Sequence, residues 1–216
     1  MSDFTLHWLE AVAPIGRWRA VVEAGVAEAW SAAARHVHPP AMDVLLQVVP
    51  GDAIPELGLV GRAYRANCFS LSLDPSNPNF AEAVATGAVA RQVVHELMHC
   101  LRYEAIGYDH NLGDALVSEG LCGHFVHECL GTSPEPWERA LTPDQLAGWL
   151  PRATAQAGGR YDHAAWFFGR GPEAPPRWAG YSLGFHLVGN YLARHPEARP
   201  SAIRGIHAAR LLREAA

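Results

Sequence analysis

The sequence lacks the features that mark a secreted, membrane-spanning or disulfide-rich protein. No apolar run reaches the ~18 residues of a membrane span, and residues 1–20 contain no cationic segment followed by an apolar one. The cysteines have no C-x-x-C spacing, which excludes a sulfur-rich zinc site and favours thiols in a reducing compartment. We therefore expect a cytoplasmic protein. The four thiols are Cys68, Cys100, Cys122 and Cys129.

An excess of positive charge is also absent. The formal net charge is -5 at pH 7, which argues against general nucleic-acid binding. Of the 216 residues, 49% are hydrophobic, enough for a buried core. We expect one domain over residues 1–216, with neither nucleic acid nor membrane as a partner. Arginines near the C-terminus are expected to cover a solvated helix face; they are Arg199, Arg204, Arg210 and Arg213.

Residues 95–99 read His-Glu-Leu-Met-His, which is an H-E-x-x-H motif. On a helix, His95 and His99 project from one face one turn apart, so both imidazoles can bind one zinc ion. Glu96 then lies beside the metal, where it can take a proton from water. The alternative interpretation is a solvated helix face that carries two histidines by chance.

The chain around this motif has a helical pattern. Asn79 is a favourable N-cap residue, and Glu82 follows three positions later, as in a capping box. An apolar residue then recurs every four positions, which is typical of a helix face packed on a core. These signals predict one helix over residues 80–106 that ends at Gly107. We expect Gly87 to weaken this helix without ending it.

A catalytic zinc site needs a third protein ligand and an open position for water. The metzincin pattern is absent, because Arg102 and Ala105 stand where it requires glycine and then histidine or aspartate. We favour Glu119, since it lies in an otherwise apolar helical run, where a buried carboxylate needs a partner such as a metal. Asn111 can cap this second helix.

Two alternatives to this role of Glu119 stay open. Glu119 could instead pair with an arginine, such as Arg91 or Arg102. The third ligand could instead be His124 or His127, although His127 lies two helical turns beyond Glu119.

This combination of residues resembles the gluzincin class of zinc metallopeptidases. The sequence is also similar to an uncharacterised bacterial family described as predicted Zn-dependent proteases, domain of unknown function 2268. The resemblance covers most of the chain from about residue 40 to residue 195. The segments that carry it are residues 54–58, 72–75, 95–99, 118–121 and 178–184.

The resemblance implies one zinc ion and Glu96 as the general base. The implied zinc ligands are His95, His99 and Glu119. The sequence departs from the pattern at Gly123, where many gluzincins carry an aspartate that orients a ligand histidine. Metal-bound histidines usually donate to such an acceptor, and Asp109, Asp114 or a backbone carbonyl could supply it here.

Peptide hydrolysis needs a hydrogen-bond donor for the developing oxyanion in addition to zinc. We expect Tyr181 to be this catalytic donor, because the resemblance covers its segment and a phenol can donate. His163 and His186 are alternatives. Tyr181 could equally be a core aromatic whose hydroxyl is bonded elsewhere.

The order of the predicted elements indicates an α+β fold. The resemblance implies a zincin-like arrangement, in which a short mixed sheet packs on the active-site helix. Strands are predicted over residues 43–49, 59–64 and 68–73. Residues 59–64 are expected at the sheet edge, where an extended peptide can bind, although Gly61 and Arg62 could belong to a turn.

The second half of the chain is predicted to be mainly helical. Further helices are expected over residues 20–36, from Thr142 onward, and over residues 180–194 and 198–214. Pro134 and Pro136 are expected to separate residues 1–133 from a helical subdomain at 134–216.

The function predicted from these observations is a zinc metallopeptidase that acts on a peptide or protein substrate. Two other functions stay open: a zinc hydrolase of a non-peptide amide, and a non-catalytic protein with a structural or decayed metal site. Glu96 argues against the second of these, because a structural site has no use for a general base.

Overall fold

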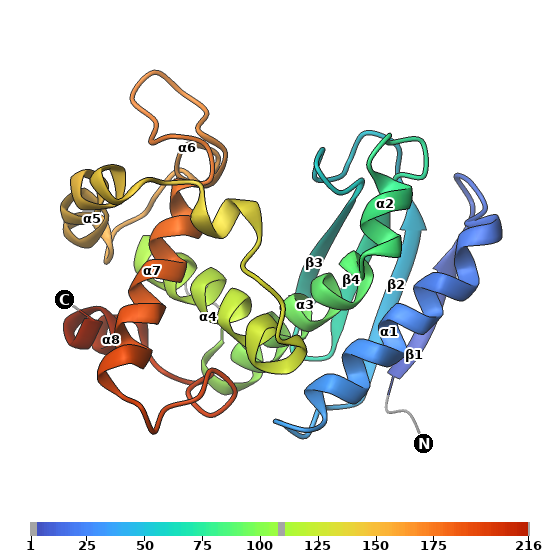
Figure 1. The fold of residues 1–216 in the computed structure, drawn as a ribbon, viewed down its shortest axis with the longest axis horizontal. Coiled ribbons are helices and arrows are strands. Elements are labelled where there is room, and N and C mark those ends of the chain that lie inside the picture. The colour runs from blue at the N-terminus through green and yellow to red at the C-terminus, as the bar shows by residue number, and fades with distance from the viewer. Residues whose placement is uncertain (1–3, 108–110, 216) are drawn as a thin grey trace. The chain divides into compact units, whose positions relative to one another are not determined.

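The computed structural model of the protein describes residues 4–107 and 111–215. The chain divides into two compact units, Met1–Glu104 and Ala105–Ala216. The first contains the sheet, and the second is helical (Figure 1). The predicted α+β fold class with a helical C-terminal part is therefore confirmed. The predicted division at residues 133 and 134 stays a prediction.

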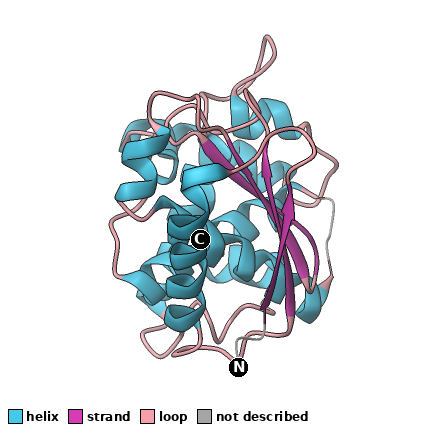
Figure 2. Ribbon diagram, turned by 90° about the vertical axis from the view of Figure 1, so that its right-hand side faces the viewer, coloured by secondary structure: helices cyan, strands magenta, loops and turns pink. Residues whose placement is uncertain are grey.

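The sheet of the first unit has four strands in the order β1-β2-β4-β3. Strands β1, β2 and β4 are parallel, and β3 runs antiparallel to β4 at the edge. Figure 2 shows the strands as one twisted sheet. Their bounds are β1 Phe4–Leu9, β2 Met42–Val48, β3 Leu59–Arg65 and β4 Cys68–Leu73.

The three strands expected from the sequence are confirmed as β2, β3 and β4, and β3 has the predicted edge position. Gly61 and Arg62 lie inside β3 rather than in a turn. The sequence analysis missed β1. This strand is followed by the helix α1, Arg19–Ala33, and then pairs with β2. A short first strand has a weak local signal, and its pairing partner lies more than thirty residues away in sequence.

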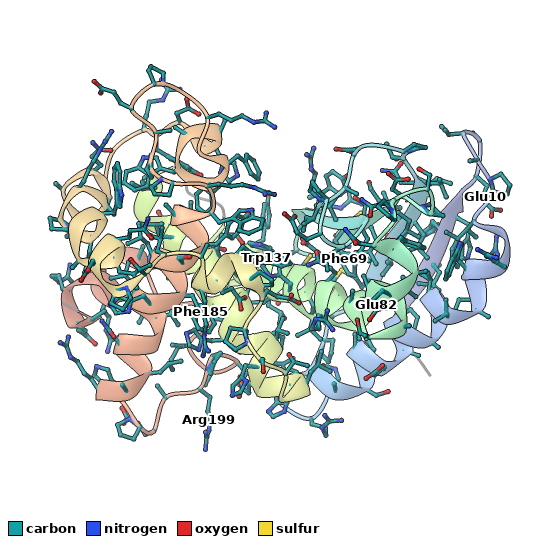
Figure 3. All side chains as sticks on the ribbon, turned by 45° about the horizontal axis from the view of Figure 1, so that its top comes forward. Glu10, Phe69, Glu82, Trp137, Phe185 and Arg199 are labelled. Atoms are coloured by element: carbon teal, nitrogen blue, oxygen red, sulfur yellow. The ribbon has the colours of Figure 1, made fainter. Side chains whose placement is uncertain are left out.

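Alternating burial along β2 orients the sheet. Met42, Val44, Leu46 and Val48 are buried, and the residues between them are half-buried. Strand β4 is buried along its whole length, and Phe69 lies in the core (Figure 3). The side chains on both faces of such a strand are covered by other parts of the protein.

The predicted single helix over residues 80–106 is wrong in one respect: the chain forms two helices, α2, Phe80–Ala85, and α3, Ala88–Ile106. Gly87 has φ +83°, outside helical geometry, and ends the first helix instead of only weakening it. The predicted end of α3 before Gly107 is confirmed. Asn79 precedes α2 as predicted but makes no side-chain cap; its amide donates to the carbonyl oxygen of Pro55 instead.

The second unit begins with α4, Leu112–Leu130, which Asn111 caps by accepting from the Asp114 N–H, as predicted. Thr142 and Gln145 form a capping box at α5, Pro143–Gln156. The remaining helices are the 3-10 helix η2, Pro136–Arg139, then α6, His163–Phe168, α7, Ala179–Arg194, and α8, Ala208–Ala215.

Helices α4 and α7 pack closely because two glycines face each other. A Cβ on Gly120 would lie 2.2 Å from the carbonyl oxygen of Gly184, and a Cβ on Gly184 would lie 2.2 Å from that of Leu116. Only glycine at these positions allows the two helices to come this close. The contact fixes α4, the helix that carries Glu119, relative to α7.

Two predictions for the second unit need correction. The helix expected over residues 198–214 forms only as α8, because residues 198–207 make turns. Helix α6 was not predicted. Arg199, in the turn region, is exposed and extends away from the ribbon (Figure 3). Among the described helices, none has the length and apolar character needed to cross a bilayer.

Candidate metal and catalytic site

Helix α3 places the two motif histidines side by side. The Nε2 atoms of His95 and His99 are 3.2 Å apart, and their ring centroids are 4.9 Å apart. Two nitrogens bound to one tetrahedral zinc at 2.0–2.1 Å would be about 3.3 Å apart. The spacing of this histidine pair therefore fits a shared zinc ion. His99 is buried and His95 is half-buried.

Glu96 lies between the two histidines in sequence and packs against the edge strand. Its side chain is buried and lies against Gly61 of β3. The N–H of Gly61 donates to Oε1 of Gln92, one helical turn before Glu96, at 3.2 Å. The sequence analysis missed Gln92 and the role of Gly61. The available signal was a glycine inside a strand, which often marks a close backbone approach.

Glu119 lies on α4 in the second unit and is half-buried. That it joins the histidine pair stays a prediction. Within its own unit, Glu119 is close enough to Tyr161 and His163 to act on their titration. Burial and the charge of Glu119 raise the pKa of Tyr161. Burial lowers the pKa of His163, and the charges of Glu119 and Asp162 oppose this shift.

Tyr181, the expected oxyanion donor, lies in the first turn of α7. The centroid of its ring is 4.9 Å from the centroid of the buried Phe167 ring. His163 stacks on the same Phe167 ring at 4.4 Å, and Tyr161 contacts it at 6.3 Å. Phe167 therefore contacts Tyr181 and His163, which the sequence analysis named, and Tyr161, which the sequence analysis missed.

The other candidate histidines bond within the second unit. His186 Nε2 lies 3.1 Å from the amide nitrogen of Asn190. His124 Nε2 donates to the carbonyl oxygen of Phe185 at 2.9 Å, and its ring stacks on the Phe185 ring. Burial lowers the pKa of His124, and His127 Nδ1 donates to the carbonyl oxygen of Thr132 at 2.8 Å.

A buried carboxylate lies against Gly123, the position where the resemblance leads one to expect aspartate. A Cβ on Gly123 would lie 2.1 Å from Oε1 of Glu138, and Glu138 Oε2 accepts from the Glu135 N–H at 2.7 Å. Of the acceptors named from the sequence, Asp114 binds the side chain of Asn111. Asp109 lies outside the described residues. Sequence spacing gave no signal for Glu138, because a loop separates it from α4.

The four cysteines are free thiols, as expected, and all four are buried. Burial raises the pKa of Cys100 to about 12, with a further contribution from the charge of Glu96. Burial also raises the pKa of Cys68. These shifts favour the protonated thiol, so neither group is a ready nucleophile at neutral pH.

Comparison with known proteins gives one match. A family model described as predicted Zn-dependent protease (DUF2268) matches residues 28–213. It extends over both units and includes every candidate site residue, and it confirms the resemblance found in the sequence. No curated protein and no solved structure matches the chain.

Proposed function

We propose that this chain, which belongs to the family of predicted Zn-dependent proteases, is a zinc metallopeptidase that hydrolyses peptide bonds. One observation carries the proposal: the Nε2 atoms of His95 and His99 are 3.2 Å apart on the helix that also carries Glu96. Nitrogens at this spacing suit a single zinc ion, and a neighbouring carboxylate suits the hydrolytic role of such an ion.

The proposed zinc ligands are His95, His99 and Glu119. This set of two histidines and one glutamate leaves a fourth position open, as catalytic zinc sites do. When bound, zinc supplies Lewis acidity, which polarises a carbonyl group and makes water acidic near neutral pH.

Glu96 is the proposed general base. It accepts one proton from the attacking water as the water oxygen bonds to the carbonyl carbon. It then delivers that proton to the amine nitrogen as the C–N bond breaks, and the second proton leaves with the new carboxyl group. Packing against Gly61 restricts the Glu96 side chain, which supports this role because a catalytic base must be held in place. Tyr181 is the proposed donor to the oxyanion.

The edge strand β3 supports a peptide as the substrate. Two of its outward backbone groups are bonded within the chain: the N–H of Gly61 donates to Gln92, and the carbonyl oxygen of Leu59 accepts from the Ile54 N–H. Because outward groups alternate along a strand, those of Ala63 face the same way. An extended peptide could pair there, and backbone pairing of this kind tolerates many side chains.

Glu96→Gln tests the proposal. Protein loaded with one equivalent of zinc is assayed against a quenched-fluorescence peptide library, and its zinc content is measured. We expect the variant to retain zinc and to lose about 10²–10⁴-fold in rate, the usual contribution of a general base. The control is Glu82→Gln, an exposed glutamate on α2, which should keep both zinc and activity.

Other outcomes select other functions. Unchanged activity in Glu96→Gln would remove Glu96 from the mechanism. Turnover of small acylated amides without turnover of peptides would assign a different amide substrate. Zinc binding without hydrolysis of either class would indicate a structural metal site.

A further inference from the structure

A cavity of about 550 Å³ opens in the first unit on the face of the sheet opposite to Glu96. Glu96 packs against Gly61, whose partner on β4 is Leu71, and Leu71 pairs in turn with Leu46 of β2. Leu45 lines the cavity, and consecutive strand residues such as Leu45 and Leu46 point to opposite faces. The cavity is therefore separate from the proposed general base, and its volume is in the range that holds a small molecule.

One wall of this cavity carries a carboxylate. Nε2 of His7, on β1, donates to Oδ1 of Asp43, on β2, at 2.7 Å. The parallel pairing of the two strands holds this pair in place. Oδ2 of Asp43 has no hydrogen-bond partner within residues 4–107 and 111–215. Asp43 therefore keeps one oxygen available to an ammonium group in the cavity.

The opposite wall carries a guanidinium. Nε of Arg65 donates to Oδ1 of Asn67 at 3.1 Å, across the turn that joins β3 to β4. This bond orients the guanidinium, whose two terminal nitrogens have no partner in the part of the chain that the structure describes. A guanidinium held in this way can bind a carboxylate through two parallel hydrogen bonds.

A β-bulge places two consecutive residues of β3 on the cavity. The register of β3 against β4 shifts between Ala63 and Arg65, so Tyr64 is the extra residue. Consecutive residues of a regular strand point to opposite faces, yet Tyr64 and Arg65 both line the cavity. The Tyr64 hydroxyl lies 3.0 Å from Oγ of Ser70, which fixes the phenol. Bulges redirect side chains in this way next to functional sites.

The floor between the two walls carries no charge. It is formed by Leu45 and Cys68, and Leu9, which is 44% exposed, lies at its end. Burial is the largest cause of the raised pKa of Cys68; the charge of Arg65 opposes it and the charge of Asp43 adds to it. Both charges therefore act on the thiol, as expected for a thiol that lies between them. The raised pKa keeps this thiol protonated at neutral pH.

The two charged walls are spaced for a ligand with opposite charges at its ends. Asp43 and Arg65 both pair with Cys68, from the two sides of β4. Since neighbouring strands lie about 4.8 Å apart, the backbones of these two residues are about 10 Å apart. Within residues 4–107 the two groups form no ion pair with each other. An extended dipeptide is about 7 Å long and has an ammonium at one end and a carboxylate at the other.

We propose that this cavity binds a dipeptide with both ends free, with its ammonium at Asp43, its carboxylate at Arg65 and an apolar side chain over Leu45. Complementary charge selects this ligand, because an uncharged apolar molecule would cover both charged groups without pairing them. The site goes beyond the proposed function and does not depend on it.

Calorimetric titration with the dipeptide Leu-Leu tests the proposal. Leucine, N-acetyl-Leu-Leu and Leu-Leu amide are the comparison ligands, since each lacks the full length or one of the two charges. We expect each to bind at least about tenfold more weakly than Leu-Leu, the usual scale for a lost hydrogen bond between charged groups. The titration is repeated with Glu96→Gln, in which the proposed hydrolysis cannot consume the dipeptide, and should give the same Kd.

Two substitutions assign the walls. Arg65→Gln should weaken Leu-Leu at least about tenfold and leave the amide nearly unchanged, because the amide has no carboxylate for the guanidinium. Asp43→Asn should weaken Leu-Leu and leave N-acetyl-Leu-Leu nearly unchanged. The matched controls are Arg62→Gln, exposed on the same strand but outside the cavity lining, and Asp52→Asn, in an exposed loop. Both controls should bind Leu-Leu normally.

The outcomes separate this proposal from the proposed function. Equal affinity of Arg65→Gln and the unchanged protein for Leu-Leu would overturn the proposal, as would equal binding of the free and capped dipeptides or no binding at all. If Asp43→Asn does not fold because His7 loses its acceptor, Arg65→Gln with the amide comparison decides alone. If Leu-Leu binds as expected and no peptide is hydrolysed by zinc-loaded protein, the cavity assignment stands and the metallopeptidase assignment is overturned.

Discussion

Gly61 and Glu96 come so close that a side chain at position 61 would have to displace the Glu96 carboxylate. A Cβ built on Gly61 would lie 2.3 Å from Oε1 of Glu96 and 2.4 Å from its Cγ. The carboxylate of Glu96, on α3, therefore occupies the space that a side chain at position 61 would take. This contact connects the strand proposed to bind substrate with the proposed general base.

Gly61→Ala should displace Glu96. We expect a loss of hydrolysis of at least tenfold, because misplacing a catalytic group by about 1 Å can cost 10²-fold, with zinc content nearly unchanged. The measurement is kcat/KM together with zinc content. Gly148→Ala is the control, since a Cβ there meets nothing within 4 Å. Full activity in Gly61→Ala would mean that the Glu96 position is not critical.

Glu119→Ala should weaken zinc binding. Loss of an outer-shell partner already costs about 10–100-fold in metal affinity, so loss of a ligand should cost more than about 100-fold. Competition with a chromogenic chelator measures this affinity. Glu173→Ala, in an exposed loop, should bind zinc normally. Unchanged zinc affinity in Glu119→Ala would point to another third ligand.

Gly184→Ala should destabilise the second unit. Its Cβ would lie 2.2 Å from the backbone carbonyl oxygen of Leu116, which cannot rotate away, so α7 would have to move from α4. We expect a loss of about 1–3 kcal/mol or more in unfolding free energy, as for other overpacked cores. Thermal and urea unfolding provide the measurement. Gly158→Ala, where a Cβ has open space, should change stability little.

Asp74→Asn should reduce the pH dependence of the free energy of unfolding. Hydrogen bonds from Ser76 and Gly51 lower the pKa of Asp74. The ionised carboxylate therefore stabilises the folded protein above its unfolded pKa of about 3.9, and this contribution is lost as pH falls through the lower folded pKa. Urea unfolding from pH 7 to pH 3 should show the variant less stable at pH 7, with the difference narrowing below about pH 4. A constant difference across this range would contradict the assignment.

Local signals predicted much of the fold. The capping box of Thr142 and Gln145 and the N-cap of Asn111 are present as expected, because a cap depends only on residues a few positions apart. The spacing of His95 and His99 likewise carried over into the structure, since four residues on a helix return to the same face.

Features that depend on backbone conformation or on distant contacts could not be predicted as well from the sequence. Glycine tolerates both helical and left-handed geometry, so the sequence could not decide whether Gly87 continues or ends a helix. The side chain of Asn79 was free to bond elsewhere, and the loop carbonyl of Pro55 is its acceptor. Residues 198–207 have helical composition but form turns.

The sequence by itself determined which residues could carry the chemistry, because His95, Glu96 and His99 lie within five consecutive positions whose helical geometry is fixed locally. Only the tertiary structure decided which distant residues lie together within each unit. The approach of Gly61 to Glu96 and the grouping of Tyr161 and His163 near Glu119 join segments more than thirty residues apart. Such contacts depend on how whole helices and strands pack, and no periodicity along the chain encodes them.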